Sequence, residues 1–185
     1  PFEAPRASKN LLLAHAAGVA AYRAEGKGQI GLVVNLEPKY PASDRPEDLS
    51  AVARADAYMN RQYLDQALLG KVPEGLAEIF GEAWEGPTDA ELAAMKVPVD
   101  FIGVNYYTRE RVAADRAGSP VVAPAQHPCT DLGWELFAEG LERLLVRLHV
   151  EYRPSAMYVT ESGAAFHTAP SASGEVHDHE RRQYL

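Results

Sequence analysis

Hydrophobic and polar residues follow two patterns along this chain, one typical of buried strands and one typical of amphipathic helices. Continuous apolar runs predict strands, and apolar residues at helical spacing predict helices between them. The expected strands are 29–36, 100–107 and the run at 156–159 that leads into Thr160 and Glu161. The expected helices are 8–24, 46–69, 73–80, 89–95, 137–152 and one that begins near 177. The segments 37–46 and 108–132 are expected to be a loop and a polar excursion.

Strands that stay apolar along their length and alternate with helices indicate an α/β fold, in which helices cover a parallel sheet. A doubly wound sheet and a β/α barrel both have this pattern. No GxGxxG or GxxxxGK[ST] motif follows an expected strand, which excludes the nucleotide-binding form of the doubly wound sheet. Polar or aromatic residues end every expected strand, as on the active face of a barrel. They are Asn35, Glu37, Asn105, Tyr106, Tyr107, Thr160 and Glu161.

The number of strands is too small for a complete barrel. A (β/α)8 TIM barrel typically needs about 250 residues and eight strands, whereas this sequence has 185 residues and three expected strands. An open arc of three parallel strands would leave two edges unpaired and an apolar interior uncovered. The first residues, PFEAPRASKN, lack Met and resemble a cut end. We therefore expect residues 1–185 to form a single partial barrel domain, incomplete at both ends, that needs the remainder of the barrel.

Composition narrows the possible partners. The formal net charge of -8 argues against non-specific binding to nucleic acid or to an anionic membrane. The single cysteine, Cys129, excludes an intramolecular disulfide and a cysteine-based zinc site, and the six histidines lack metal-ligand spacing. No apolar run is long enough to span a membrane, and no signal peptide is recognised. We expect no metal, no cofactor and, from the scarcity of cysteine, a cytoplasmic location.

Glu161 is the first candidate for chemistry. It follows a short apolar run bounded by Pro154 and Gly163, so a buried strand would hold its carboxylate rigidly at the edge where catalytic residues collect in β/α folds. Solvated loop residues and helix caps also occur at such positions. The local pattern alone leaves these interpretations open.

Several longer segments together resemble one family of enzymes. VTESGAAF at 159–166 resembles the nucleophile motif of glycoside hydrolase family one, whose usual form is TENG. DFIGVNYYTR at 100–109 and TDLGWELFAEGL at 130–141 resemble its sixth strand and the segment before its sixth helix. NLEPKYPAS at 35–43 and the segment 54–76 are similar to its fifth strand and fifth helix. The resemblance implies strands five to seven, about three β/α units, from after the fourth strand to the start of the seventh helix.

The resemblance also implies an activity and a set of site residues. The family hydrolyses β-glycosidic bonds with retention, which requires two carboxyl groups about 5–5.5 Å apart. Glu161 matches the nucleophile that forms the covalent glycosyl-enzyme, and Tyr107 matches a tyrosine whose hydroxyl orients it. Asn105 matches a polar residue near the sugar, and Trp134 matches a tryptophan on the leaving-group side of the cleft. From the residues alone, Tyr107 could instead be a packed barrel aromatic and Trp134 a core anchor at a helix start.

The acid/base residue implied by the resemblance is absent from the sequence. In the family it lies in an NEP motif before the helix that is expected here from residue 8. The segment Asn35–Pro38 is not this motif, because it has an extra residue and lies one β/α unit too late. We therefore expect Glu37 to be a loop carboxylate at the cleft rim, and the isolated chain to be inactive and poorly folded.

Three alternatives remain open at this stage. A small-molecule β-glycoside is the expected substrate, but a 6-phospho-β-glycoside would fit the same fold. A non-catalytic remnant or a carbohydrate-binding pseudoenzyme would also keep much of the pattern.

Ser162 stands where the family usually has Asn, so we expect an altered rate rather than lost chemistry.

Overall fold

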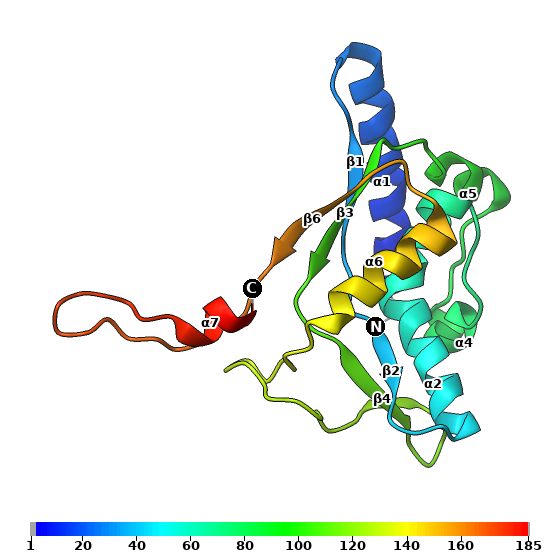
Figure 1. The fold of residues 1–185 in the computed structure, drawn as a ribbon. Coiled ribbons are helices and arrows are strands. Elements are labelled where there is room, and N and C mark those ends of the chain that lie inside the picture. Colours follow the sequence, from blue (N-terminus) through cyan, green and yellow to red (C-terminus); the bar gives the residue numbers. More distant parts are fainter. Residues whose placement is uncertain (1–2, 185) are drawn as a thin grey trace.

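The computed structural model describes residues 3–184, and its centre is a parallel sheet of three strands. The strands are β1 (Gly31–Asn35), β3 (Phe101–Tyr106) and β6 (Met157–Ser162), in the order β1-β3-β6 (Figure 1). They lie within two residues of the expected strands. A long apolar run can be buried only if its backbone N–H and C=O groups pair with those of neighbouring strands.

Helices cover one face of this sheet (Figure 1). Two of them are α1 (Ala4–Glu25) and α6 (Glu139–Tyr152), which begin four residues before and two residues after the expected positions. Pro5 lies in the first turn of α1, where its missing N–H costs nothing. The core between helices and sheet is a cluster of buried apolar residues that includes Leu12, Leu32, Leu64, Val104, Leu144 and Leu148.

The other face of the sheet is bare. Val33 of β1 is 51% exposed, and Tyr158 of β6, which is in the same row of the sheet and so points to the same face, is 50% exposed. In the middle of the sheet stands Gly103, whose neighbours Val33 and Thr160 close in from both sides. The expected uncovered interior of an open barrel arc is therefore present in the structure.

The expected helix over 46–69 is continuous but not uniform. It consists of α2 (Pro46–Asp56), the π-helical turn η1 (Ala57–Arg61), α3 (Gln62–Leu64) and a second π-helical turn, η2 (Asp65–Leu69). It ends at Gly70, whose φ of 66° is a left-handed conformation that glycine adopts without strain. Two π-helical turns in one helix are unusual, and such turns often occur near functional sites.

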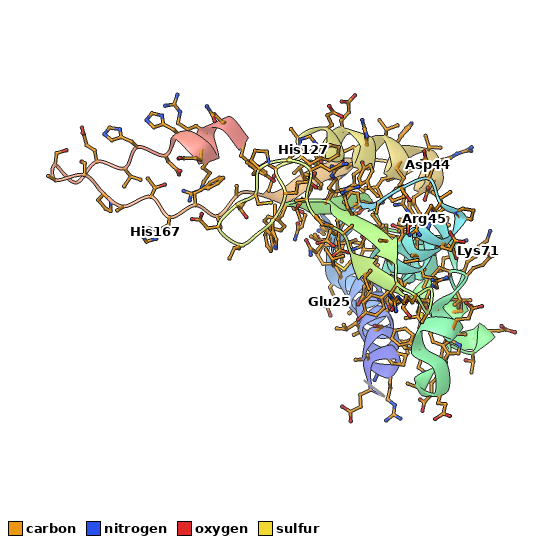
Figure 2. The ribbon with its side chains drawn as sticks, turned by 90° about the horizontal axis from the view of Figure 1, so that it is seen from below. Glu25, Asp44, Arg45, Lys71, His127 and His167 are labelled. Carbon is orange, nitrogen blue, oxygen red and sulfur yellow. The ribbon has the colours of Figure 1, made fainter. Side chains whose placement is uncertain are left out.

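The remaining helices are short. They are α4 (Leu76–Phe80), η3 (Gly81–Ala83), α5 (Asp89–Met95) and α7 (His179–Tyr184). Helix α5 matches its expected range, since Thr88 and Glu91 form a capping box at its start. The segment between β6 and α7, which carries His167, extends away from the body of the structure (Figures 1 and 2).

A second, smaller sheet corrects one expectation. Strands β2 (Lys39–Pro41), β4 (Glu110–Ala114) and β5 (Pro120–Val122) lie in the segments expected to be a loop and a polar excursion. Strand β2 pairs in parallel with β4, and β4 pairs antiparallel with β5. These strands are short and carry proline or charged residues, so they lack the apolar runs that marked the main sheet. The small sheet follows directly after the carboxyl ends of β1 and β3.

Candidate active site

A row of three polar residues crosses the carboxyl end of the main sheet. Asn35 of β1 pairs in register with Asn105 of β3, which pairs with Glu161 of β6. The register shifts just before this row, because Val104 pairs with Val159 while Asn105 pairs with Glu161, which leaves Thr160 as an extra residue. Such a bulge bends the strand and re-aims the next side chain. The sheet therefore brings two of the predicted site residues, Asn105 and Glu161, side by side.

Tyr107 contacts Glu161 directly. Its hydroxyl donates a hydrogen bond to the Oε2 atom of the Glu161 carboxylate. The pKa of Tyr107 is raised, first by this hydrogen bond and then by burial and the negative charge of Glu161, because ionising the phenol would lose the bond and bring two anions together. Tyr107 therefore stays a protonated donor, and its hydrogen bond orients the Glu161 carboxylate.

Trp134 lies next to this pair. Its ring centroid is 5.5 Å from that of Tyr107, with an angle of 49° between the planes. The side chain is 39% exposed and lies before α6 rather than inside its packing face. A small hollow of about 30 Å³ runs from Trp134 and Tyr107 to the end of β1, where Asn35 and Glu37 line it. An exposed indole beside a hollow can stack on the apolar face of a ligand.

Asn105 is held by its neighbour on β6. The Thr160 hydroxyl donates to Asn105 Oδ1 at 2.6 Å, which fixes the orientation of the Asn105 amide. Thr160 is the extra residue of the bulge, so the irregularity that re-aims Glu161 also positions Asn105. The four predicted site residues thus form one group at the ends of β3 and β6.

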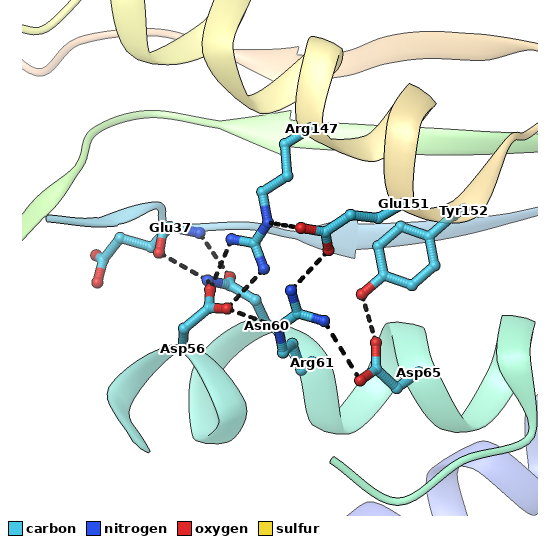
Figure 3. A network of polar contacts seen from close by, with 8 residues as sticks. All are labelled: Glu37, Asp56, Asn60, Arg61, Asp65, Arg147, Glu151 and Tyr152. Atoms are coloured by element: carbon cyan, nitrogen blue, oxygen red, sulfur yellow. Dashed lines mark hydrogen bonds and ion pairs between the residues drawn. The ribbon is translucent and has the colours of Figure 1, made fainter. Parts of the chain in front are cut away.

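Glu37 lies at the rim of the same hollow, where it is part of an ion-pair network. Its carboxylate contacts Lys39 Nζ, which also pairs with Glu110 of β4 at 2.7 Å. The backbone N–H and C=O of Glu37 are both bound by the buried amide of Asn60, at 3.0 and 2.9 Å (Figure 3). The π-helical turn η1 carries Asn60, so the irregular helix fixes the chain at the end of β1.

Some contacts of the site were not predicted from the sequence. The hydroxyl of Tyr184 in α7 donates to the backbone oxygen of Tyr107 at 3.1 Å and lies 3.2 Å from Ser162 Oγ. Arg109 and Glu135, which follow Tyr107 and Trp134 closely in sequence, form a buried ion pair. Nothing in the sequence indicated that Arg109 and Glu135 meet, or that Tyr184 reaches the site.

Residues 3–184 contain neither a metal-ligating cluster nor a helix that could cross a membrane. In this part of the chain, no group of three or more His, Cys, Asp or Glu side chains could hold a metal ion. Each helix within the same range is too short or too polar to cross a bilayer.

Comparison with known proteins identifies the family. The model of glycosyl hydrolase family 1 matches residues 2–185. The chain belongs to glycosyl hydrolase family 1. It is 34% identical to beta-glucosidase A of Acetivibrio thermocellus over 187 residues, which cover 96% of this chain and 42% of that enzyme. It is also 33% identical to the 6-phospho-beta-glucosidase GmuD of Bacillus subtilis, over 87% of this chain and 38% of the relative.

Solved structures of the family give the same result for the fold. The family 1 b-glucosidase from Thermotoga maritima in complex with isofagomine lactam matches the whole chain with a TM-score of 0.93 and 34% identity. The match covers 42% of that enzyme. The chain is therefore an α/β fragment that corresponds to part of the family 1 TIM barrel, and it spans about two fifths of the length of the family 1 enzymes it matches.

Proposed function

We propose that this chain is part of a retaining β-glycosidase of the β-glucosidase type, in which Glu161 is the nucleophile. The observation that carries the proposal is the hydrogen bond from Tyr107 to Glu161 at the ends of neighbouring strands. A nucleophilic carboxylate must be aimed at one carbon atom, and a fixed phenolic donor on one of its oxygens supports this requirement.

The chemistry follows in two steps. In the first, a Glu161 oxygen attacks the anomeric carbon, the glycosidic C–O bond breaks, and an acid residue elsewhere in the complete protein protonates the leaving oxygen. In the second, the same residue takes a proton from water, the water oxygen attacks the anomeric carbon, and the ester bond to Glu161 breaks. The tyrosine hydroxyl holds the other carboxylate oxygen in both steps.

The neighbouring residues have binding roles in this proposal. Asn105 hydrogen-bonds a sugar hydroxyl, and Trp134 stacks on the leaving group, as its exposed ring beside the hollow suggests. No cofactor takes part.

The domain organisation is also a proposal. The three main strands are the fifth to seventh of the barrel, and residues 1–185 are a partial barrel domain whose bare sheet face the remaining strands cover. The acid/base residue belongs to that remainder, so the chain alone is inactive.

A labelling experiment on the complete protein tests the nucleophile. A 2-deoxy-2-fluoro-β-glucoside with an activated leaving group forms a long-lived glycosyl-enzyme, because the fluorine slows both steps. We expect the sugar on the peptide that contains Glu161 by mass spectrometry, and no label on that peptide after Glu161→Gln. Label on a different carboxylate, or turnover without any trapped species, would overturn the proposal.

A second substrate class has support from one comparison. The similarity to a 6-phospho-beta-glucosidase leaves 6-phospho-β-glucosides as the alternative substrate. The ratio of kcat/KM for a β-glucoside and its 6-phosphate distinguishes the two. We expect the unphosphorylated sugar to be preferred, and the opposite ratio would assign the alternative. A complete protein that binds glucosides without hydrolysing either substrate would be the non-catalytic form.

A further inference from the structure

Two buried charges lie beside the candidate site and have no part in the proposed chemistry. Arg109, which is 8% exposed, comes two residues after Tyr107. Glu135, which is 4% exposed, comes directly after Trp134. Burying two charges is costly unless they are paired and fully hydrogen-bonded. Their contacts therefore show which parts of the structure the two residues hold together.

The two side chains form a bidentate ion pair. Arg109 Nε donates to Glu135 Oε2 at 2.9 Å, and Arg109 Nη2 donates to Oε1 at 3.1 Å. The Oε1 atom also accepts the backbone N–H groups of Gln126 and His127, each at 2.8 Å. Burial alone would raise the pKa of Glu135, but these hydrogen bonds and the Arg109 charge outweigh it and hold that pKa at about 2. Glu135 is therefore ionised at neutral pH, and its carboxylate binds the backbone of residues 126 and 127.

Aromatic rings pack against the guanidinium plane of Arg109, while Glu135 binds its edge. Its guanidinium carbon lies 3.8 Å from the ring centroid of Phe137 and 5.1 Å from that of Tyr40 in β2. Arginine combines a planar stacking face with a fork that matches a carboxylate, and lysine has neither. The geometry of the pair therefore depends on arginine.

The pair joins the backbone that carries Trp134 to the strand end that carries Tyr107. The Thr108 hydroxyl donates to the backbone oxygen of Glu135 at 2.9 Å, beside the ion pair. The Trp134 backbone is fixed in turn by Thr130, whose N–H donates to Trp134 O at 2.8 Å and whose Oγ1 accepts from Trp134 N at 3.2 Å. Trp134 thus stands on a loop that the Arg109–Glu135 pair attaches to the end of β3, together with the Thr108 hydroxyl and the Tyr106 hydroxyl, which donates to the backbone oxygen of Phe137 at 2.5 Å.

We infer that the Arg109–Glu135 pair positions Trp134 against Tyr107 and so shapes the leaving-group side of the site. The inference rests on the proposed function, because it assigns the pair to one half of that reaction. Buried ion pairs often add little stability but restrict geometry. Here the restricted geometry is the 5.5 Å approach of the two rings.

The two-step reaction gives this role a signature that a purely structural role lacks. The leaving group is present in the first step and gone in the second. A displaced Trp134 therefore lowers kcat/KM for substrates whose leaving group reaches it, while the second step, which is common to all substrates, keeps its rate. A general loss of folded protein would reduce every rate by the same factor.

The test uses Glu135→Gln and Arg109→Lys in the complete protein. The matched control is Glu139→Gln, which removes the same charge from an exposed ion pair with Arg143 on α6. Rates for an aryl β-glucoside and for methyl β-glucoside are divided by the number of active sites, counted with the trapping reagent. For Glu135→Gln we expect kcat/KM to fall about tenfold for the aryl substrate, the worth of one aromatic stack, and less than about twofold for the methyl substrate.

Other variants and outcomes sharpen the result. Arg109→Lys keeps the charge but loses the fork and the stacking face, so we expect a smaller loss, about threefold, in the same direction. Glu139→Gln should leave both substrates unchanged. Equal losses for both leaving groups, or no loss in either buried variant, would overturn the role of the pair alone. Failure of the wild type to be labelled at Glu161 would instead overturn the proposed function and this inference with it.

Discussion

Two groups of charged and hydrogen-bonded residues in this structure use the same residue types but differ in how completely their charges are matched. The helix cluster joins the long helix 46–69 to α6 (Figure 3). Asp56 in this cluster accepts two hydrogen bonds from Arg147, at 2.8 and 2.6 Å, and further ones from Asn60 and Arg61. The other members are Asp65, Glu151 and Tyr152.

The strand-end cluster consists of Tyr107, Arg109, Trp134, Glu135 and Glu161. Only its buried charges, those of Arg109 and Glu135, are paired with each other. Glu135 is surrounded by donors, whereas Glu161 is exposed and accepts a hydrogen bond from Tyr107. A carboxylate whose charge is fully matched has no capacity left to attack a substrate, and one that is exposed at a strand end has. Under the proposed function, the helix cluster serves stability and the strand-end cluster serves reactivity.

The largest expected difference between the clusters is in the effect on turnover when one carboxylate is removed from each. Glu161→Gln in the complete protein should lower turnover of an aryl β-glucoside by about three orders of magnitude or more, because a nucleophile has no substitute in a covalent mechanism. Glu151→Gln, the matched change in the helix cluster, should leave turnover per folded molecule within about twofold. Steady-state kinetics check both, and a Glu161→Gln protein with a tenth of wild-type turnover would contradict the comparison.

A tyrosine from each cluster gives a smaller contrast. Tyr107→Phe should lower turnover by about 10- to 100-fold, since a hydrogen bond to a charged group contributes about 1.5–3 kcal/mol. Tyr152→Phe removes the bond to the Asp65 carboxylate and should lower the free energy of unfolding by about 1.5–3 kcal/mol without changing turnover. Turnover and the free energy of unfolding are measured for both variants. If both tyrosines affected turnover equally, the functional distinction between the clusters would fail.

Arg147→Met should affect stability alone. It removes the two hydrogen bonds to Asp56, but Arg61 and Asn60 still bind that carboxylate. We therefore expect the free energy of unfolding to fall by about 2 kcal/mol, less than for an unpaired buried charge. Denaturant unfolding of the complete protein measures the change, and Arg143→Met on the exposed pair with Glu139 is the control, with an expected change of less than about 0.5 kcal/mol.

Acid unfolding gives the most specific effect. The pKa of Glu135 is lowered in the folded protein from the usual 4.5 to about 2, so its stabilising contribution is complete above about pH 4.5 and is lost as the pH falls towards 2. Glu135→Gln should therefore be less stable than wild type at neutral pH, and the difference should shrink between pH 4.5 and 2. Unfolding free energies measured along this range test it. A difference that stays constant would mean that Glu135 does not titrate as the structure requires.

The sequence predicted the elements with strong periodic signals. The three apolar runs became β1, β3 and β6, because a buried parallel strand needs apolar residues on both faces. Strands β2, β4 and β5 were missed, since a three-residue strand such as Lys39–Pro41 has no period to detect. The π-helical turns were missed for a related reason, because a one-residue change in hydrogen-bond spacing leaves the apolar pattern almost unchanged.

The site residues could be predicted from the sequence only in part. Glu161 could be proposed from its place at a strand end, and Tyr107, Asn105 and Trp134 from the family resemblance. The contacts of Arg109 with Glu135 could not, because 26 residues separate them and their meeting depends on strands that gave no signal. Local pattern identified which residues belong to the edge of the sheet, while their mutual orientation required the three-dimensional structure.

Gly103 has a consequence for the mutational tolerance of this sheet. A β-carbon at this position would lie 2.7 Å from Val33 Cγ2 and 3.0 Å from Thr160 Cγ2, so even alanine would displace the side chains of both neighbouring strands. The row of Asn35, Asn105 and Glu161 lies two residues further along the same strands. In a library that randomises position 103 of the complete protein, active clones should therefore carry glycine almost exclusively, although the residue has no chemistry of its own.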